Sequence, residues 1–298
     1  MHVRENKYGN ERPDPESQLW RQITITTKNL TQSTINSIIT KETNYLDIPY
    51  CSVSQIEPRE GHPSSRILKF LHTNFPTRPR TRLKFLVLQG FRGEDILAAM
   101  LAAKSPDLTS LDLFESRYSL MTTIIEQMTG DNKITSLNLS SIRPYETPEP
   151  GEFYASTLRL DTVQLLVDKC KKLTSLILAG TEMSQKAISH ICAHITPNLE
   201  RLNIADELMM DTYYETLSSR CRKLQYLNIL GTRIKWRTII TFIPTWNTTM
   251  VDLSLPYYME YVLSITPEHP DLEMKKKFTH MINSMKCLQL LSINQYRI

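Results

Sequence analysis

The chain has 298 residues, 41% of them hydrophobic, which is enough apolar material for a substantial core in one elongated or two compact domains. Its formal net charge of +4 lacks the clustered positive excess of a nucleic-acid-binding protein, so we expect no nucleic acid as a partner. No stretch of about 18 apolar residues occurs, and we therefore expect no membrane span. Five cysteines without Cys-x-x-Cys spacing argue against a disulfide framework and favour the cytoplasm or the nucleus.

A periodic leucine pattern runs through most of the chain. The pattern Leu-x-x-Leu-x-Leu, with isoleucine or methionine at some positions, occurs eight times, and successive copies start 25, 26, 39, 26, 25, 26 and 38 residues apart. The copies begin at Leu83, Leu108, Ile134, Leu173, Leu199, Leu224, Met250 and Leu288. A period of about 26 residues is typical of leucine-rich repeats. Weaker copies near residues 20–25 and 45–48 predict an array of about 8–10 repeats.

Each copy predicts one strand followed by one helix. The alternating apolar residues indicate a short strand, and the segment after it has helical spacing, most clearly at Ile188, Ile191, Cys192 and Ile195. Each unit can bury its apolar face only against its neighbours. The sequence therefore predicts an α/β fold over residues 19–298, a leucine-rich-repeat solenoid (horseshoe) with a parallel sheet on the concave face and helices outside.

Two insertions interrupt the period, near residues 142–157 and 257–280. The first contains three prolines and three glutamates, which indicates an extended acidic loop. The second combines three tyrosines and two prolines with a run of three lysines. We expect both to leave the array as loops. Either they clamp a ligand or they are tolerated surface loops.

The predicted sheet face supplies the candidate binding residues. The non-leucine positions of each strand point into the concavity, and those assigned to a protein partner are Phe85, Val87, Asp112, Phe114, Asn138, Ile177, Arg201, Asn203, Tyr226, Asn228 and Asp252. Exposed aromatic and arginine side chains dominate interface energetics. The alternative is that the strand aromatics only pack against the adjacent repeat.

One basic run is a second candidate. Arg78, Arg80 and Arg82 form a patch that pairs well with an acidic or phosphorylated motif, because guanidinium groups bind such groups bidentately. The alternative is an ordinary solvated loop.

The sequence has no recognisable catalytic loop and one weak candidate for a metal site. The eight glycines form neither a GxGxxG nor a GxxxxGK loop, and no Gly-x-Ser-x-Gly elbow occurs. His190 and His194 have the i,i+4 spacing of a zinc site, but position 191 is isoleucine where a zinc protease has glutamate. Cys170 and Cys221 occupy one repeat position, which favours small buried residues over reactive thiols. We therefore expect no enzyme, cofactor or bound metal.

The start of the array resembles a known family. The stretch Glu16-Ser17-Gln18-Leu19-Trp20 leads into Lys28-Asn29-Leu30, and a similar stretch ends the F-box and opens the first repeat in F-box proteins with leucine-rich repeats. The cysteines before the first leucine are similar to the cysteine-containing class of that family. The resemblance covers residues 19–298.

This resemblance implies the substrate-recognition part of an SCF-type (Skp-cullin-F-box) ubiquitin ligase, itself non-catalytic, with a protein substrate on the concave face. We expect residues 1–18 to be a disordered tail that ends a missing F-box region. Binding to the adaptor and the cullin would then require an F-box upstream. The alternative function is an F-box-less scaffold or inhibitor that sequesters a partner protein.

Overall fold

The computed structural model describes residues 21–24, 43–47, 84–88, 105–142, 158–207, 209–267, 269, 271–293 and 296–297. Three predictions lie outside these residues. They are the N-terminal tail 1–18, the basic patch Arg78, Arg80 and Arg82, and residues 143–157 of the first insertion. The chain divides into two units, Met1–Gly151 and Glu152–Ile298.

The first unit contains a parallel sheet. Its strands are β1 (Arg21–Thr24), β2 (Thr43–Asp47), β3 (Phe85–Val87), β4 (Ser110–Asp112) and β5 (Ser136–Asn138), each paired with the next. The helix α4 (Tyr118–Gln127) buries Leu120, Met121, Ile124 and Ile125. This spacing places the four side chains on one face of the helix, as expected for an amphipathic helix on a core.

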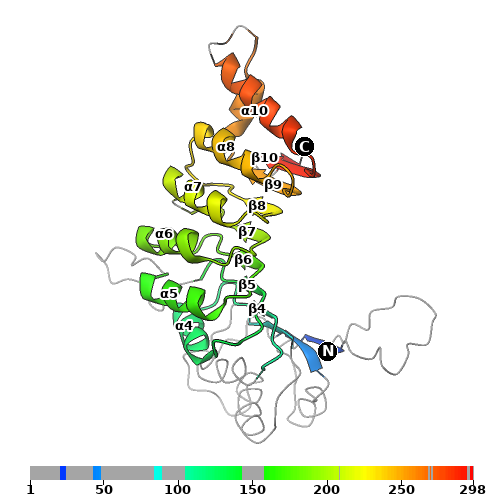
Figure 1. Ribbon diagram of the computed structural model, residues 1–298. Coiled ribbons are helices and arrows are strands. Elements are labelled where there is room, and N and C mark those ends of the chain that lie inside the picture. Colours follow the sequence, from blue (N-terminus) through cyan, green and yellow to red (C-terminus); the bar gives the residue numbers. More distant parts are fainter. Residues whose placement is uncertain are drawn as a thin grey trace, which may run out of the picture. The chain divides into compact units, whose positions relative to one another are not determined.

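The second unit alternates helices and strands. Its elements are α5 (Leu160–Lys169), β6 (Ser175–Ile177), α6 (Gln185–His194), β7 (Arg201–Asn203), α7 (Asp211–Arg220), β8 (Tyr226–Asn228), α8 (Trp236–Phe242), the 3-10 helix η2 (Ile243–Trp246), β9 (Asp252–Leu255), α9 (Met259–Ser264), α10 (Leu272–Ser284), β10 (Leu290–Ile293) and β11 (Tyr296–Arg297). Strands β6 to β10 are parallel, and β11 pairs antiparallel with β10. Helices α6, α7 and α8 lie on one side of the strands (Figure 1). The predicted α/β class with parallel strands is confirmed.

The strand register matches the one expected from the leucine pattern. In the second unit Leu176 pairs with Leu202, which pairs with Leu227, which pairs with Leu253. In the first unit Leu86, Leu111 and Leu137 are aligned in the same way. All seven are almost fully buried. One continuous column of leucines therefore lies in the core of each unit.

A left-handed turn follows the strand in several repeats. The residue two positions after the last leucine of the pattern has a positive φ at Glu115 (56°), Ser141 (53°), Gly180 (66°), Asp206 (63°) and Gly231 (68°). The turn residue is thus a glycine in only two of these five repeats. Non-glycine residues pay a conformational cost there, so the surrounding repeat structure holds the turn in place.

The second insertion is helical rather than the expected loop. Residues 257–280 contain α9 and most of α10, which bury Met259 and Val262 from the first helix and Met274, Phe278 and Met281 from the second. Met274, Phe278 and Met281 are spaced i, i+4, i+7, which is the pattern of a helix face. In the sequence the two prolines before these residues favoured a loop over a helix.

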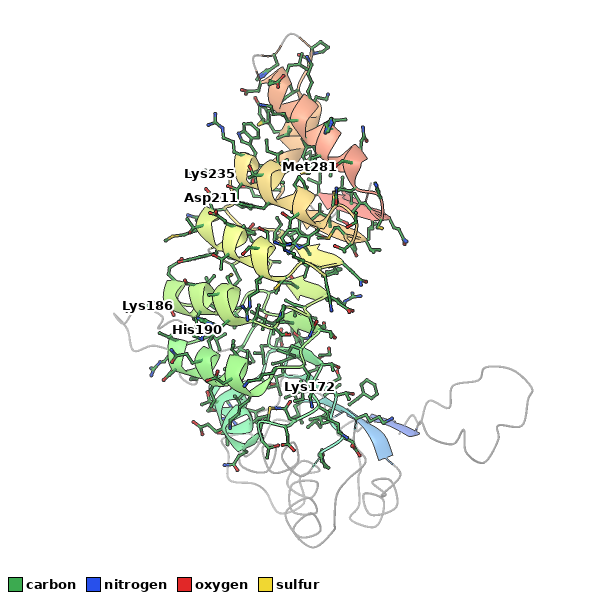
Figure 2. The ribbon with its side chains drawn as sticks, in the orientation of Figure 1. Lys172, Lys186, His190, Asp211, Lys235 and Met281 are labelled. Atoms are coloured by element: carbon green, nitrogen blue, oxygen red, sulfur yellow. The ribbon has the colours of Figure 1, made fainter. Side chains whose placement is uncertain are left out.

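Side chains also tie neighbouring repeats together on the helical side. Trp246 Nε1 donates to the backbone oxygen of Cys221 at 2.7 Å. The N–H of Lys235 donates to Asp211 Oδ1 at 3.0 Å. Figure 2 shows Asp211 at the start of α7 and Lys235 at the start of α8. Each bond joins residues about one repeat apart, so these bonds link successive repeats.

Candidate functional site

The strands of the second unit have one side that the helices do not occupy. The middle residue of each three-residue strand is buried, and its two neighbours are half-buried or exposed and point to the opposite side. We call this side the open face. In the second unit it carries Ser175, Ile177, Arg201, Asn203, Tyr226, Asn228 and Asp252.

The most distinctive contact of the open face joins Arg201 and Tyr226. They are paired on neighbouring strands β7 and β8, and the Cζ of Arg201 lies 4.7 Å from the centre of the Tyr226 ring. Arg201 is exposed and Tyr226 is half-buried. A guanidinium over an aromatic face is attracted to it electrostatically. The pair therefore presents a preorganised cation beside an aromatic surface.

Four predicted binding residues also end their own strands. The N–H of Ala205 donates to Asn203 Oδ1 at 3.1 Å, and the N–H of Leu230 donates to Asn228 Oδ1 at 3.0 Å. In the first unit the N–H groups of Phe114 and Ser140 donate in the same way to Asp112 and Asn138. Such bonds satisfy the backbone where the ladder stops. These side-chain oxygens have a structural role, whatever else they contact.

The remaining predicted residues lie as follows. Asp252 begins β9 next to Tyr226, and Ile177 ends β6 beside Asn203; both are half-buried. Phe85 and Val87 flank Leu86 on β3, and Phe114 follows β4, all half-buried in the first unit. Arg201, Asn203, Tyr226, Asn228, Asp252 and Ile177 therefore share one face of the second unit. The other five residues share the first unit.

A buried acid was missed by the sequence analysis. Glu207 is 2% exposed, and its carboxylate accepts the N–H of Thr181 at 2.7 Å and that of Met183 at 3.4 Å. Burial raises the pKa of Glu207 from 4.5 to about 7, against the lowering effect of these two bonds. The signal was present in the repeat, because the equivalent position holds the buried hydroxyl residues Ser116, Thr181 and Thr232.

The histidine pair lies on α6, on the helical side. The ring centres of His190 and His194 are 4.2 Å apart. Burial and the neighbouring His194 lower the pKa of His190, and Asp168 partly offsets this. Among the described residues, no group of three or more His, Cys, Asp or Glu side chains is placed to hold a metal ion.

Three cysteines of the second unit lie in the core. Cys170, Cys192 and Cys221 are buried and free, and burial raises the pKa of their thiols to about 12, 12 and 11. A thiol with such a pKa stays protonated near neutral pH and is a poor nucleophile. The predicted buried position of Cys170 and Cys221 is confirmed.

None of the helices in the described segments has the length and apolar character needed to cross a membrane. No family model and no curated protein matches the chain.

Proposed function

We propose that this chain is a leucine-rich-repeat solenoid, with the parallel sheet on the concave face, and that it binds a protein partner through the open face. Support comes from the repeat spacing, from the aligned leucine columns, and from the mixture of polar and aromatic side chains on the uncovered side of the strands. Stacked repeats of this kind build extended binding surfaces.

The Arg201–Tyr226 pair carries the proposal. Arginine and tyrosine are enriched at the energetic centres of interfaces, where a single truncation costs about 2 kcal/mol or more of binding. The pair is already ordered by its own contact, so binding loses less side-chain entropy. A partner with an acidic or amide group can bond the exposed guanidinium while its apolar atoms pack on the ring.

The partner we propose is a substrate of an SCF-type ubiquitin ligase, with this chain as the non-catalytic receptor. The proposal rests on the resemblance of residues 16–30 to F-box proteins with leucine-rich repeats. Co-purification of the adaptor and the cullin with the protein expressed from its own gene tests this part. A partner captured in their absence would instead indicate a scaffold or inhibitor.

The binding face is tested with a matched pair of variants. R201A/Y226A removes the open-face pair, and W236A/R237A removes a second cation–π pair, on α8, in which Arg237 Cζ lies 5.5 Å from the ring centre of Trp236. Partners captured by the wild-type chain are quantified by mass spectrometry, with circular dichroism as the folding control. We expect the first variant to lose the partner and the second to keep it. Retention by R201A/Y226A, or equal loss by both variants, would reject the open face.

A further inference from the structure

Two adjoining cavities lie among α5, α6 and α7. The larger, of about 590 Å³, is lined by residues that include Asp168, Lys171 and Arg220. The smaller, of about 400 Å³, is lined by residues that include Lys186 and Tyr213. Gln164, His190 and His194 line both cavities. The histidine pair is therefore the shared wall of one groove, which we call the outer groove.

The outer groove is on the helical side of the unit, away from the open face. Lys186 and His190, both labelled on α6 in Figure 2, lie on the opposite side of that helix from its buried residues Ala187, Ile188, Ile191 and Cys192. Lys186 is exposed and His190 is half-buried. A ligand in the outer groove therefore contacts none of the residues that carry the proposed sheet interface.

The charges in the outer groove are unbalanced. Among the described residues that line it, Lys171, Lys186 and Arg220 are cations, and Asp168 is the only carboxylate. The rest of the lining is mainly polar, with Gln164, Thr196 and Ser189 among it. A polar, positively charged hollow favours an anionic occupant over an apolar helix.

Arg220 is fixed in the wall of the groove. Its Nε donates to the backbone oxygen of Ile195, and one terminal nitrogen donates to the oxygen of His194 at 3.1 Å. These bonds cap the C-terminal end of α6 and hold the guanidinium in place. A guanidinium has five N–H donors, so two such bonds leave donors for a ligand.

The histidines add a response to pH. His190 and His194 lie against each other, and His190 is less basic than an ordinary histidine because burial and the second ring disfavour its charged form. The charges that shift the pKa of His190 belong to His194 on the same helix and Asp168 on α5. The cavities around it are also lined by the titratable groups Lys171, Lys186, Arg220 and Tyr213. An anion entering the groove would favour the protonated rings, so binding should take up protons.

We propose that the outer groove binds an anionic segment of a partner protein, with closely spaced carboxylates or a phosphate group against Lys171, Lys186 and Arg220. The partner segment is a peptide rather than single-stranded nucleic acid. Nucleic acid of that kind is held by successive aromatic platforms, whereas Tyr213 is the only tyrosine, phenylalanine or tryptophan among the described lining residues. The outer groove is thus a second interaction surface, independent of the open face.

The experiment is fluorescence anisotropy on the full chain with four labelled probes. They are a glutamate-rich peptide, a phosphoserine peptide, the glutamine version of the first, and a single-stranded oligonucleotide of equal charge. We expect the acidic or the phosphorylated peptide to bind, more weakly as salt is raised, and the glutamine peptide not to bind. Which of the two binds identifies the anionic group.

Variants assign the binding to the outer groove. K171E/K186E reverses two exposed lysines of the groove, and K276E/K286E reverses two exposed lysines outside it, with the same change in net charge. We expect the groove variant to lose at least about tenfold in affinity and the control to lose about threefold or less. Lowering the pH from about 7.5 to 6 should strengthen binding in the wild type but not in H190A/H194A.

Several results would overturn the proposal. They are no binding of either anionic peptide, equal losses in the two lysine variants, and tighter binding of the oligonucleotide than of the peptides. R201A/Y226A should bind the peptide normally. If R201A/Y226A loses the protein partner of the open face but still binds the peptide, the outer-groove proposal stands. If the groove test fails, the proposed open-face interface is unaffected.

Discussion

Neighbouring residues of β8 have opposite environments. Leu227 is 0% exposed and belongs to the leucine column, whereas Tyr226, one position earlier, is half-buried on the open face beside Arg201. Because strand side chains alternate, one step along the chain separates core from surface. If the open face binds a partner as proposed, substitutions at two neighbouring positions of a three-residue strand should affect stability and recognition separately.

The largest expected effect tests this separation directly. Leu227→Ala leaves a cavity in a tightly packed column and should cost about 2–5 kcal/mol of unfolding free energy. Tyr226→Ala removes a half-buried ring and one cation–π contact, which should cost about 1 kcal/mol or less. Urea unfolding of the full chain, followed by circular dichroism, measures both. Similar losses of unfolding free energy would show that Tyr226 on the open face stabilises the fold as much as Leu227 does.

Glu207 is a carboxylic acid buried among mainly apolar residues. Burial raises its pKa from 4.5 to about 7, so the folded chain favours the protonated carboxyl more than the unfolded chain does. The stability that this difference provides is fully present below about pH 4.5 and is lost as the pH rises through about 7. The loss relative to Glu207→Gln should reach about 3 kcal/mol, since each unit of pKa is worth about 1.4 kcal/mol. Urea midpoints of the two chains between about pH 4.5 and 8 measure this difference.

The control is Glu215→Gln, at an exposed position of α7. It should leave the pH dependence of the wild type unchanged. If Glu207→Gln also follows the wild-type curve throughout, the carboxylate is not buried as described.

The sequence predicted the leucine columns because parallel pairing repeats one register, so each Leu-x-x-Leu-x-Leu copy repeats the placement of the last. Leu202 and Leu227 could therefore be aligned without coordinates. Glu207 was not assigned in this way, although hydroxyl residues occupy the same position in other repeats, because a charged residue in a turn is normally taken as exposed. Its two backbone donors come from the preceding repeat, a contact that composition does not reveal.

The same limit explains the second insertion and the outer groove. Met274, Phe278 and Met281 had helical spacing, but the prolines before them favoured a loop. Lys171, Lys186 and Arg220 are far apart in the sequence and meet only after α5, α6 and α7 pack. On the open face the candidate residues could be placed in columns, whereas the Arg201–Tyr226 contact depends on side-chain conformations that the pattern leaves open.

Gly231 lies in the left-handed turn that follows β8. Its φ is +68°, and an added Cβ would lie 1.9 Å from Asp206 Oδ1 and 3.2 Å from Asp206 Cα. Gly231→Ala should therefore cost about 1–3 kcal/mol, from both backbone strain and the contact with Asp206. Thermal unfolding of Gly130→Ala is the control, because nothing lies within 4 Å of its added Cβ. Asp206 has a positive φ of its own, so D206A/G231A is compared with Asp206→Ala rather than with the wild type. Against that reference the glycine substitution should cost less, because the contact with Oδ1 is gone, and no remaining cost would mean that the positive φ of Gly231 matters little.

The smallest expected effect concerns the residue on the other side of Leu227. Asn228→Ala removes the acceptor for the N–H of Leu230, a bond of 3.0 Å, and should cost about 1 kcal/mol. Asn228→Asp keeps an acceptor oxygen and should cost less. Urea unfolding and partner capture are measured on the same samples. If Asn228→Ala unfolds like the wild type but loses the partner, Asn228 is a recognition residue. If it loses stability and keeps the partner, Asn228 stabilises the fold and does not contact the partner. Recognition on the open face would then depend on the first strand positions, those of Arg201 and Tyr226.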